Sequence, residues 1–377
     1  GMYSVGAKAV AVKVDAGSDY VRENYADMAQ AVKKASKNYT VKLLQNVTED
    51  INIPASKVVN LDLNGHTLTN ASGDTITVAA KGTLTIQGEG TVDNVTHAKA
   101  AIVNNGTVTL NGGTYTRSKE NPENNKDDGG GNSYYTILND KGGNMTINSG
   151  VTVTNAGHFS SMIRNGGDGN SSAKSVLTIN GGTFSGGINT IKNDDYGVLT
   201  INDGNFSNTS QFVVMNWNDA TINGGTFSVN KSAEAVLQTA AWTPSGERSV
   251  GKMTINGGTF KGTGKQAMIE PTFVYNDTTY SGTASVSGGV FTADVKNFCA
   301  PGYKTELTNG VYVVKAGTND AINALDAAVK AIDNSEGDKD TKVDTAIAEV
   351  AKIPNETLSS NSSTMDKLAK LDEELTK

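Results

Sequence analysis

A phrase close to Thr-Ile-Asn-Gly-Gly-Thr-Phe recurs along most of this 377-residue chain. When its copies are aligned on the apolar residue before the Asn, the steps between them are 23, 24, 37, 32, 22, 21, 33 and 31 residues. The long steps have the length of the 21–24-residue unit plus an inserted loop. Self-similarity at such a period indicates a stacked array of units, not an ordinary globular core. The aligned apolar residues are Leu63, Ile86, Leu110, Ile147, Ile179, Ile201, Ile222, Ile255 and Val286.

Each unit of the array contains three short β segments. In one well-defined copy the segments are Ala101–Gly106, Thr107–Leu110 and Thr114–Thr116, separated by two turn signals. One such unit cannot bury its inner side chains alone, but units stacked at ~4.8 Å, strand on strand, share one continuous core. The sequence therefore predicts an all-β solenoid, a single-stranded parallel β-helix with coils of about 22 residues and three strands each.

Three columns of similar side chains follow from the alignment. The first lies at a tight turn and contains Asn111, Asn148, Asn180, Asn202, Asn223 and Asn256, with Asn64, Gln87 and Ser287 at matching positions. The second contains Tyr115, Phe184, Phe206, Phe227, Phe260 and Phe291, with Leu68 in the first copy. The third contains Asn104, Asn139, Asn165, Asn193 and Asn216 and continues as Gln238 and Glu270. We expect the amides to hydrogen-bond along the rod and the rings to stack inside the core.

Other repeat architectures fit the pattern less well, and composition excludes some functions. The leucine-rich pattern, the period of six of hexapeptide helices and the ~40-residue blade of propellers are all missing. The net charge of −7 and the presence of only four Arg argue against a nucleic-acid partner, because phosphate contacts need clustered cations. The single Cys299 excludes an internal disulfide and a Cys-based zinc site.

With these columns and coils, the chain resembles the right-handed parallel β-helix of the pectin-lyase-like superfamily. It is more similar still to cell-surface and secreted proteins of gut-dwelling bacteria. The similar segments are an amphipathic helix, Thr40–Val47, Leu61–Leu68, the repeated coils, Val290–Val295, Gly302–Tyr303 and Val311–Val314. The resemblance covers roughly residues 20–315. It implies a right-handed β-helix in an extracellular or cell-surface, adhesin-like protein.

The ends of the chain differ from the array in pattern. Residues 1–18 are expected to be a leader or flexible N-terminus, and 19–315 the capped β-helix. Val21, Tyr25, Met28, Val32 and Ala35 fit one face of a helix over 19–36, which would cover the apolar end of the rod. Asp19 is the expected N-cap. Residues 316–377 carry three further helical stripes and predict a small C-terminal helical module. With both ends capped, the protein is expected to be a monomer.

Insertions point to a candidate binding face. Three of them follow the strand that ends in the third Asn column, at 166–174, 239–251 and 271–282, and a fourth, 117–134, leaves from another corner. Repeat arrays place insertions on binding faces. The coils that carry Asn193 and Asn216 have short turns and lie between coils with long insertions. This arrangement predicts a saddle-shaped surface with the insertions as its walls. Its expected floor and wall residues are Asp194, Asp195, Tyr196, Trp217, Asn218, Asp219 and Trp242.

Side-chain alternation adds two cations to this saddle. If Ile163 and Ile191 face the core, Arg164 and Lys192 face outward on neighbouring coils. Left unpaired, they could bind an anionic sugar. Alternatively, they pair with Asp194, Asp195 or other surface acids, and the sequence leaves both readings open.

These features support three hypotheses for the function. The first is a non-catalytic surface protein that binds carbohydrate or host glycan on its lateral face. The second is a lyase or hydrolase acting on an acidic polysaccharide, although the polygalacturonase-like signatures are missing as a set and Asp194-Asp195 alone is a weak match. The third is a structural stalk. No cofactor is expected, calcium in the acidic loop Lys126–Gly129 being the alternative, and no apolar segment is long enough to span a membrane.

Overall fold

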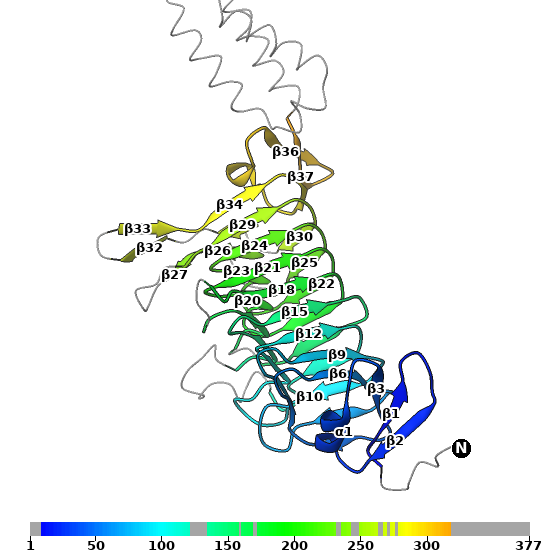
Figure 1. Cartoon of the computed structure of the whole chain (residues 1–377). Helices are drawn as coiled ribbons and strands as arrows, with labels where there is room; N and C mark the ends of the chain where they lie inside the picture. Colours follow the sequence, from blue (N-terminus) through cyan, green and yellow to red (C-terminus); the bar gives the residue numbers. More distant parts are fainter. Residues whose placement is uncertain are drawn as a thin grey trace, which may run out of the picture.

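The computed structural model describes residues 9–120, 134–157, 160–168, 172–230, 235–242, 249–262, 267–269, 272–275 and 278–317. Over this part the chain winds into a parallel β-helix whose three long sheets run along the rod, as Figure 1 shows. The predicted fold class is therefore confirmed. The stripes beyond Gly317, and with them the expected C-terminal module, lie outside the described residues.

Two of the sheets contain twelve strands each. Sheet A has the spatial order β2 (Val21–Tyr25), β1 (Ala11–Asp15), β3 (Tyr39–Leu43), β6 (Val58–Asp62), β9 (Thr83–Gln87), β12 (Thr107–Leu110), β15 (Asn144–Ile147), β18 (Ser175–Ile179), β21 (Gly197–Ile201), β24 (Asp219–Ile222), β29 (Lys252–Ile255) and β34 (Thr283–Val286). Sheet B has the order β36 (Tyr303–Thr308), β37 (Val311–Ala316), β35 (Gly289–Phe291), β30 (Thr259–Gly262), β25 (Thr226–Val229), β22 (Asn205–Asn208), β19 (Thr183–Gly186), β16 (Thr152–Asn155), β13 (Thr114–Thr116), β10 (Thr91–Asp93), β7 (Thr67–Thr69) and β4 (Val47–Thr48).

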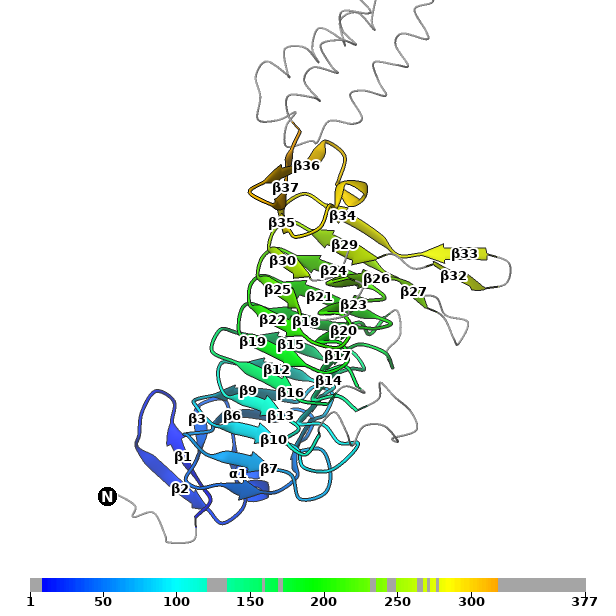
Figure 2. The same cartoon turned by 180° about the vertical axis from the view of Figure 1, so that it is seen from behind.

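The third sheet carries the insertions. Sheet C has the order β31 (Met268–Ile269), β26 (Leu237–Thr239), β23 (Val214–Asn216), β20 (Ile191–Asn193), β17 (Ile163–Asn165), β14 (Ile137–Asn139), β11 (Ile102–Asn104), β8 (Ile76–Val78) and β5 (Ile51–Ile53). Two antiparallel hairpins leave this side of the rod, as Figure 2 shows. They are β27 (Ala241–Trp242) with β28 (Ser249–Val250), and β32 (Thr272–Tyr275) with β33 (Thr278–Ser281).

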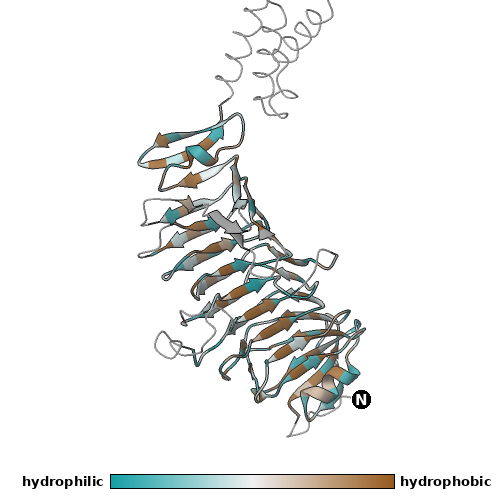
Figure 3. Cartoon of the chain, turned by 90° about the vertical axis from the view of Figure 1, so that its left-hand side faces the viewer, coloured by the Kyte–Doolittle hydropathy of each residue, from teal (hydrophilic) through white to brown (hydrophobic). Residues whose placement is uncertain are grey.

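The core is built by side chains that stack in register from coil to coil. Leu110 pairs with Ile147, which pairs with Ile179, and all three are fully buried. Hydrophobic segments accordingly recur on the strands along the whole rod in Figure 3. The predicted ring stacking is confirmed for Phe184, Phe206, Phe227, Phe260 and Phe291, whose ring centroids lie 4.6–4.8 Å apart with planes within 5–10°. Tyr115 lies in the same column, but Val153 separates it from Phe184.

Both amide columns form hydrogen-bonded ladders. In the buried ladder, Asn104, Asn139, Asn165 and Asn193 each donate to the next member, ending at Asn216, over 2.7–2.8 Å. The exposed ladder runs from Asn256 to Asn111 over 2.7–2.9 Å. The predicted continuation at Gln238 is wrong, because Thr239 pairs with Asn216 and accepts its amide at 3.2 Å. Gln238 pairs with Met215 on the outer face, as the period of two requires, and Glu270 lies outside the described residues.

The N-terminal cap differs from its prediction. Val21–Tyr25 is strand β2, paired with β1, and the helix α1 spans only Met28–Lys34 with Asp27 as N-cap. Val21 and Tyr25 fit a helical face by spacing, but antiparallel pairing with β1 decides the conformation. The expected leader 1–18 contains β1, which pairs with both β2 and β3. The rod is thus closed by a three-stranded edge and α1, whose Met28, Ala31 and Val32 are buried.

The other end of the described rod is closed by strands. After β34, the short 3-10 helix η1 (Lys296–Phe298) leads to the antiparallel strands β36 and β37, and β37 pairs with the terminal coil strand β35. Val295 and Val314 are buried there against the last coils. The change from parallel to antiparallel pairing ends the solenoid.

Candidate functional site

The predicted site residues gather on the outer face of sheet C. Strands β17 and β20 pair Ile163 with Ile191, both fully buried, and Arg164 with Lys192, which face outward. The next strand places Met215 in the same outward column. The predicted alternation is confirmed, and it puts the two cations on adjacent coils.

Both cations bind one carboxylate. Nε of Arg164 donates to Oδ2 of Asp194 at 2.8 Å, and Nζ of Lys192 lies 3.0 Å from the same oxygen. Asp194 follows β20 directly, and its backbone N–H donates to the carbonyl of Asn165 one coil below. Among the two readings left open by the sequence, pairing is correct. The expectation of unpaired cations, on which the acidic-polysaccharide hypothesis depended, is wrong.

Two further carboxylates face Arg164 from neighbouring turns. Its Nη1 lies 4.0 Å from Oδ2 of Asp140, and its Nη2 lies 3.8 Å from Oδ1 of Asp168. The Asp140 side chain is only 2% exposed, whereas that of Asp168 is 61% exposed. Asp140 follows β14 and Asp168 lies in the insertion after β17, so the cluster joins three successive coils.

Two aromatic rings complete the cluster. Nζ of Lys192 lies 4.2 Å from the centre of the Trp217 ring, and Cζ of Arg164 lies 5.4 Å from that of Tyr135. Trp217 follows β23, with its N–H bonded to the carbonyl of Asn193, so it stands one coil above Asp194. Trp217 stays partly exposed, while Tyr135 is buried. Tyr135 was not predicted, and the only sequence signal was its position where the 117–134 insertion returns to the coil.

Burial and neighbouring charges both shift the pKa values of these groups. It lowers the pKa of the Lys192 ammonium, and the charge of Asp194 offsets this only in part. Burial alone would raise the pKa of Asp194, but the charges of Lys192 and Arg164 outweigh it and hold the pKa below its ordinary value. Burial also raises the pKa of Tyr135 to about 12. At neutral pH the cluster therefore contains an ionised Asp194 and a neutral Tyr135.

The remaining predicted residues lie near this cluster to different degrees. Asp195 is close enough for its charge to act on the pKa of Lys192, and its carbonyl accepts the N–H of Gly167 at 2.7 Å. Tyr196 occupies the left-handed region of the same turn, at φ 58°. Asp219 forms an exposed ion pair with Lys174 at 3.3 Å, and Asn218 donates its backbone N–H to Asn216. The backbone of Trp242 lies in hairpin β27–β28, and its side chain lies outside the description, so its role as a wall stays a prediction.

The insertions emerge where the sequence predicts. Those after Asn165, Thr239 and Ile269 follow β17, β26 and β31 of sheet C, and the fourth follows β13 of sheet B. The ends of this fourth insertion are joined by a buried arginine. Nη1 of Arg117 donates to the carbonyl of Tyr134 at 2.6 Å, and Nη2 pairs with the buried carboxylate of Glu120. Nδ1 of His97 lies 3.2 Å from the same carboxylate.

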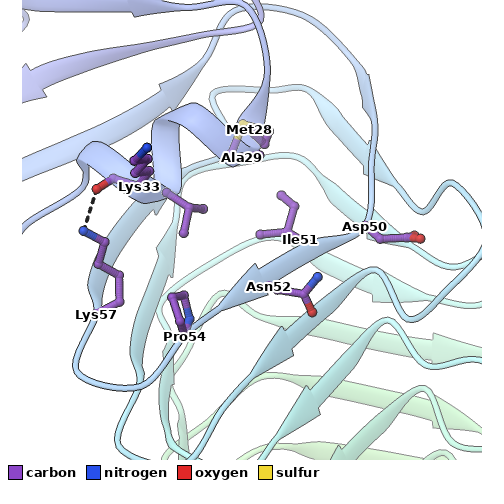
Figure 4. Close-up of a pocket in the computed structure, with 9 residues that line it drawn as sticks. Met28, Ala29, Lys33, Asp50, Ile51, Asn52, Pro54 and Lys57 are labelled. Atoms are coloured by element: carbon purple, nitrogen blue, oxygen red, sulfur yellow. Dashed lines mark hydrogen bonds between the residues drawn. The ribbon is translucent and has the colours of Figure 1, made fainter.

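A hollow of about 300 Å³ lies at the N-terminal cap between α1 and β5 (Figure 4). Its apolar lining includes Met28, Val32 and Ile51, and Lys33 and Lys57 stand at one end. Nζ of Lys57 donates to the carbonyl of Lys33 at 2.6 Å. This hollow lies outside the repeated columns, so no feature of the sequence pointed to it.

The described part of the chain offers no metal site of the usual ligand types. The described residues contain no group of three His, Cys, Asp or Glu side chains that could hold a metal ion, and Lys126–Gly129 lies outside them. No helix in the described part of the chain is long and apolar enough to cross a membrane. No match was found among protein-family models, curated proteins or solved structures.

Proposed function

We propose that this is a non-catalytic extracellular or cell-surface protein, adhesin-like and built on a right-handed β-helix of the pectin-lyase-like type, that binds carbohydrate on its lateral face. The observation that carries the proposal is the partly exposed Trp217 ring, held by Lys192 at 4.2 Å beside a polar network on sheet C. Glycan sites combine an apolar ring face with a few placed polar groups.

The rigidity of the support favours this use of the ring. Trp217 is fixed by a backbone bond to Asn193 and by the Lys192 ammonium, which Asp194 holds in turn. A ring that is already oriented loses little conformational entropy when a ligand binds, which improves affinity for weak ligands such as sugars. The hairpins β27–β28 and β32–β33 project from the same side of the rod, so this face is not flat (Figure 2).

The alternative of a lyase acting on an acidic polysaccharide has less support. A buried lysine with a lowered pKa suits a general base. However, Lys192 is engaged by Asp194 and Trp217, and Arg164 by three carboxylates, so neither cation is available for a substrate carboxylate. A purely structural stalk is the second alternative, and the insertions concentrated on sheet C weigh against it.

The test is a glycan array probed with and without calcium, together with an assay for unsaturated sugar products on the same panel. We expect binding without product, and loss of binding in Trp217→Ala. A matched control is Tyr20→Ala, which removes a ring that faces a cation, Arg22, at 4.6 Å at the far end of the rod. Product release would replace the proposal with a lyase, and absence of both signals would favour the stalk.

A further inference from the structure

We propose that the site around Trp217, Lys192 and Asp194 on sheet C, here called the lateral site, selects uncharged glycans and discriminates against acidic ones such as uronate polymers. This inference rests on the proposed function, and it names the class of ligand for the same site. It follows from how the two cations of the cluster are engaged.

The charges around the two cations are dominated by carboxylates. Arg164 faces Asp194, Asp168 and Asp140 at 2.8, 3.8 and 4.0 Å. Lys192 binds Asp194 at 3.0 Å and lies within the field of Asp195. Among the described residues, three carboxylates lie within 4.0 Å of the two cations, so this group of five side chains carries a net negative charge. An anionic sugar approaching Trp217 meets a net negative surface.

Recruiting Arg164 or Lys192 for a ligand would leave a carboxylate unpaired. Both cations bind the same oxygen of Asp194, and the Asp194 side chain is only 7% exposed. If an acidic ligand drew either cation away, this buried carboxylate would lose a partner without gaining water. Leaving a buried charge unpaired is among the larger penalties in proteins. The geometry therefore holds both cations in place and opposes their transfer to a ligand.

Instead of binding a ligand, Lys192 and Arg164 position the aromatic ring of Trp217. Nζ of Lys192 is placed over the Trp217 ring by its ion pair with Asp194, and Arg164 steadies Asp194 from the next coil. Lys192 is therefore a positioning residue for Trp217, and Asp194 acts through Lys192. A pyranose ring stacks on an indole through its C–H groups, which carry no charge, and it needs no ion pair from the site.

The experiment compares neutral and acidic oligosaccharides of the same chain length by isothermal titration calorimetry. The probes are cellohexaose and a β-1,4-galactohexaose as neutral ligands, and a hexagalacturonate as the acidic ligand. We expect at least one neutral ligand to bind, and the hexagalacturonate to bind at least about tenfold more weakly. The difference should shrink between 0.1 M and 1 M salt, because the screening length falls from about 10 Å to about 3 Å.

Charge variants identify the source of the discrimination. Asp168→Asn removes an exposed carboxylate 3.8 Å from Arg164, and we expect it to strengthen hexagalacturonate binding several-fold more than it changes neutral binding. The control Asp203→Asn makes the same change of net charge in the turn between β21 and β22, away from sheet C, and should have no effect. Lys192→Gln should weaken neutral binding by releasing the ring, although it removes no ligand contact.

The outcomes separate this inference from the proposed function. Hexagalacturonate binding as tight as neutral binding, and lost in Trp217→Ala, would overturn the selectivity and leave glycan binding intact. Equal effects of Asp168→Asn and Asp203→Asn would overturn the charge argument. No binding of any oligosaccharide would remove the proposed function itself.

Discussion

Asn165 donates its side-chain amide to Oδ1 of Asn193 across 2.8 Å, in a place where neither residue is exposed. The same bond repeats along the rod, so Asn139, Asn165 and Asn193 each donate to one neighbouring amide and accept from the other. Each amide also donates to backbone carbonyls, which are satisfied away from water in this way. We therefore expect the buried ladder to be a main determinant of stability.

This expectation can be tested with two asparagines in the same geometry. Asn193→Ala removes the donor to Asn216 and to the carbonyls of Gly197 and Asp219, and should destabilise the fold by about 3 kcal/mol. Asn202 donates to Asn180 at the same 2.8 Å but is exposed, so water can replace it. Asn202→Ala should change stability by only about 0.5 kcal/mol. Urea unfolding of both variants measures the difference, and equal effects would show that burial of the ladder is irrelevant.

The aromatic column makes a second prediction about position in a stack. Phe227 lies between two rings, with centroids 4.7 Å and 4.8 Å away, whereas Phe291 stacks on Phe260 alone among the described rings. A stacked pair adds about 0.5–1.5 kcal/mol beyond area burial. Phe227→Leu should therefore lower the free energy of unfolding by about 1 kcal/mol more than Phe291→Leu. The measurement is urea unfolding, and an equal or larger loss at Phe291 would contradict the stacking argument.

Much of the fold could be predicted because the same pattern of apolar, Asn and aromatic residues recurs in most coils. Each column places one residue type at one register position, so Asn111 and Phe184 are recognisable through their counterparts on other coils. The column failed at Gln238, where an inserted hairpin begins and the true counterpart, Thr239, is one residue later. The N-terminal edge has no counterpart elsewhere in the chain, and there the spacing of Val21 and Tyr25 fitted a helix as well as a strand.

The candidate site could be predicted only in outline. Alternation gives the direction of Arg164 and Lys192, since a strand turns successive side chains to opposite faces. It does not give their partners, because Asp140 and Asp168 arrive from other turns whose paths depend on loop conformation. Tyr135 was missed for the same reason, and so was the hollow beneath α1.

The buried pair at the base of the 117–134 insertion predicts strong coupling. Removing the guanidinium in Arg117→Met leaves the carboxylate of Glu120 buried beside His97, and should destabilise the protein by about 3–5 kcal/mol. In the double variant with Glu120→Met both charges are absent, so the loss should be smaller than in the single variant. The exposed pair Arg22–Asp15, at 2.7 Å, is the control and should show only weak coupling, because solvent screens both charges. The measurement is thermal unfolding of the single and double variants of both pairs. Additive effects of the Arg117 and Glu120 substitutions would show that the pair is not coupled.

The shared carboxylate of Asp194 predicts how stability depends on acid. Its pKa in the folded protein is lowered from 3.8, burial being outweighed by the charges of Lys192 and Arg164. As the pH falls, the Asp194 carboxylate of the unfolded chain takes up a proton near pH 3.8, whereas in the folded protein it does so only at a lower pH. The stabilisation is therefore complete above the unfolded pKa and is lost as the pH falls through the folded pKa.

Asp194→Asn isolates this contribution, because the amide does not titrate in that range. The variant should be less stable than the wild type at neutral pH by roughly 3 kcal/mol, since the buried Lys192 and the partly buried Arg164 lose their common partner. Between about pH 5 and about pH 2 the wild type should lose stability more steeply than the variant, so the two curves converge. Asp219→Asn, which removes a half-exposed partner of Lys174, should keep the steep wild-type slope. The measurement is urea unfolding across that range, and parallel curves for wild type and Asp194→Asn would show that Asp194 does not couple folding to protonation.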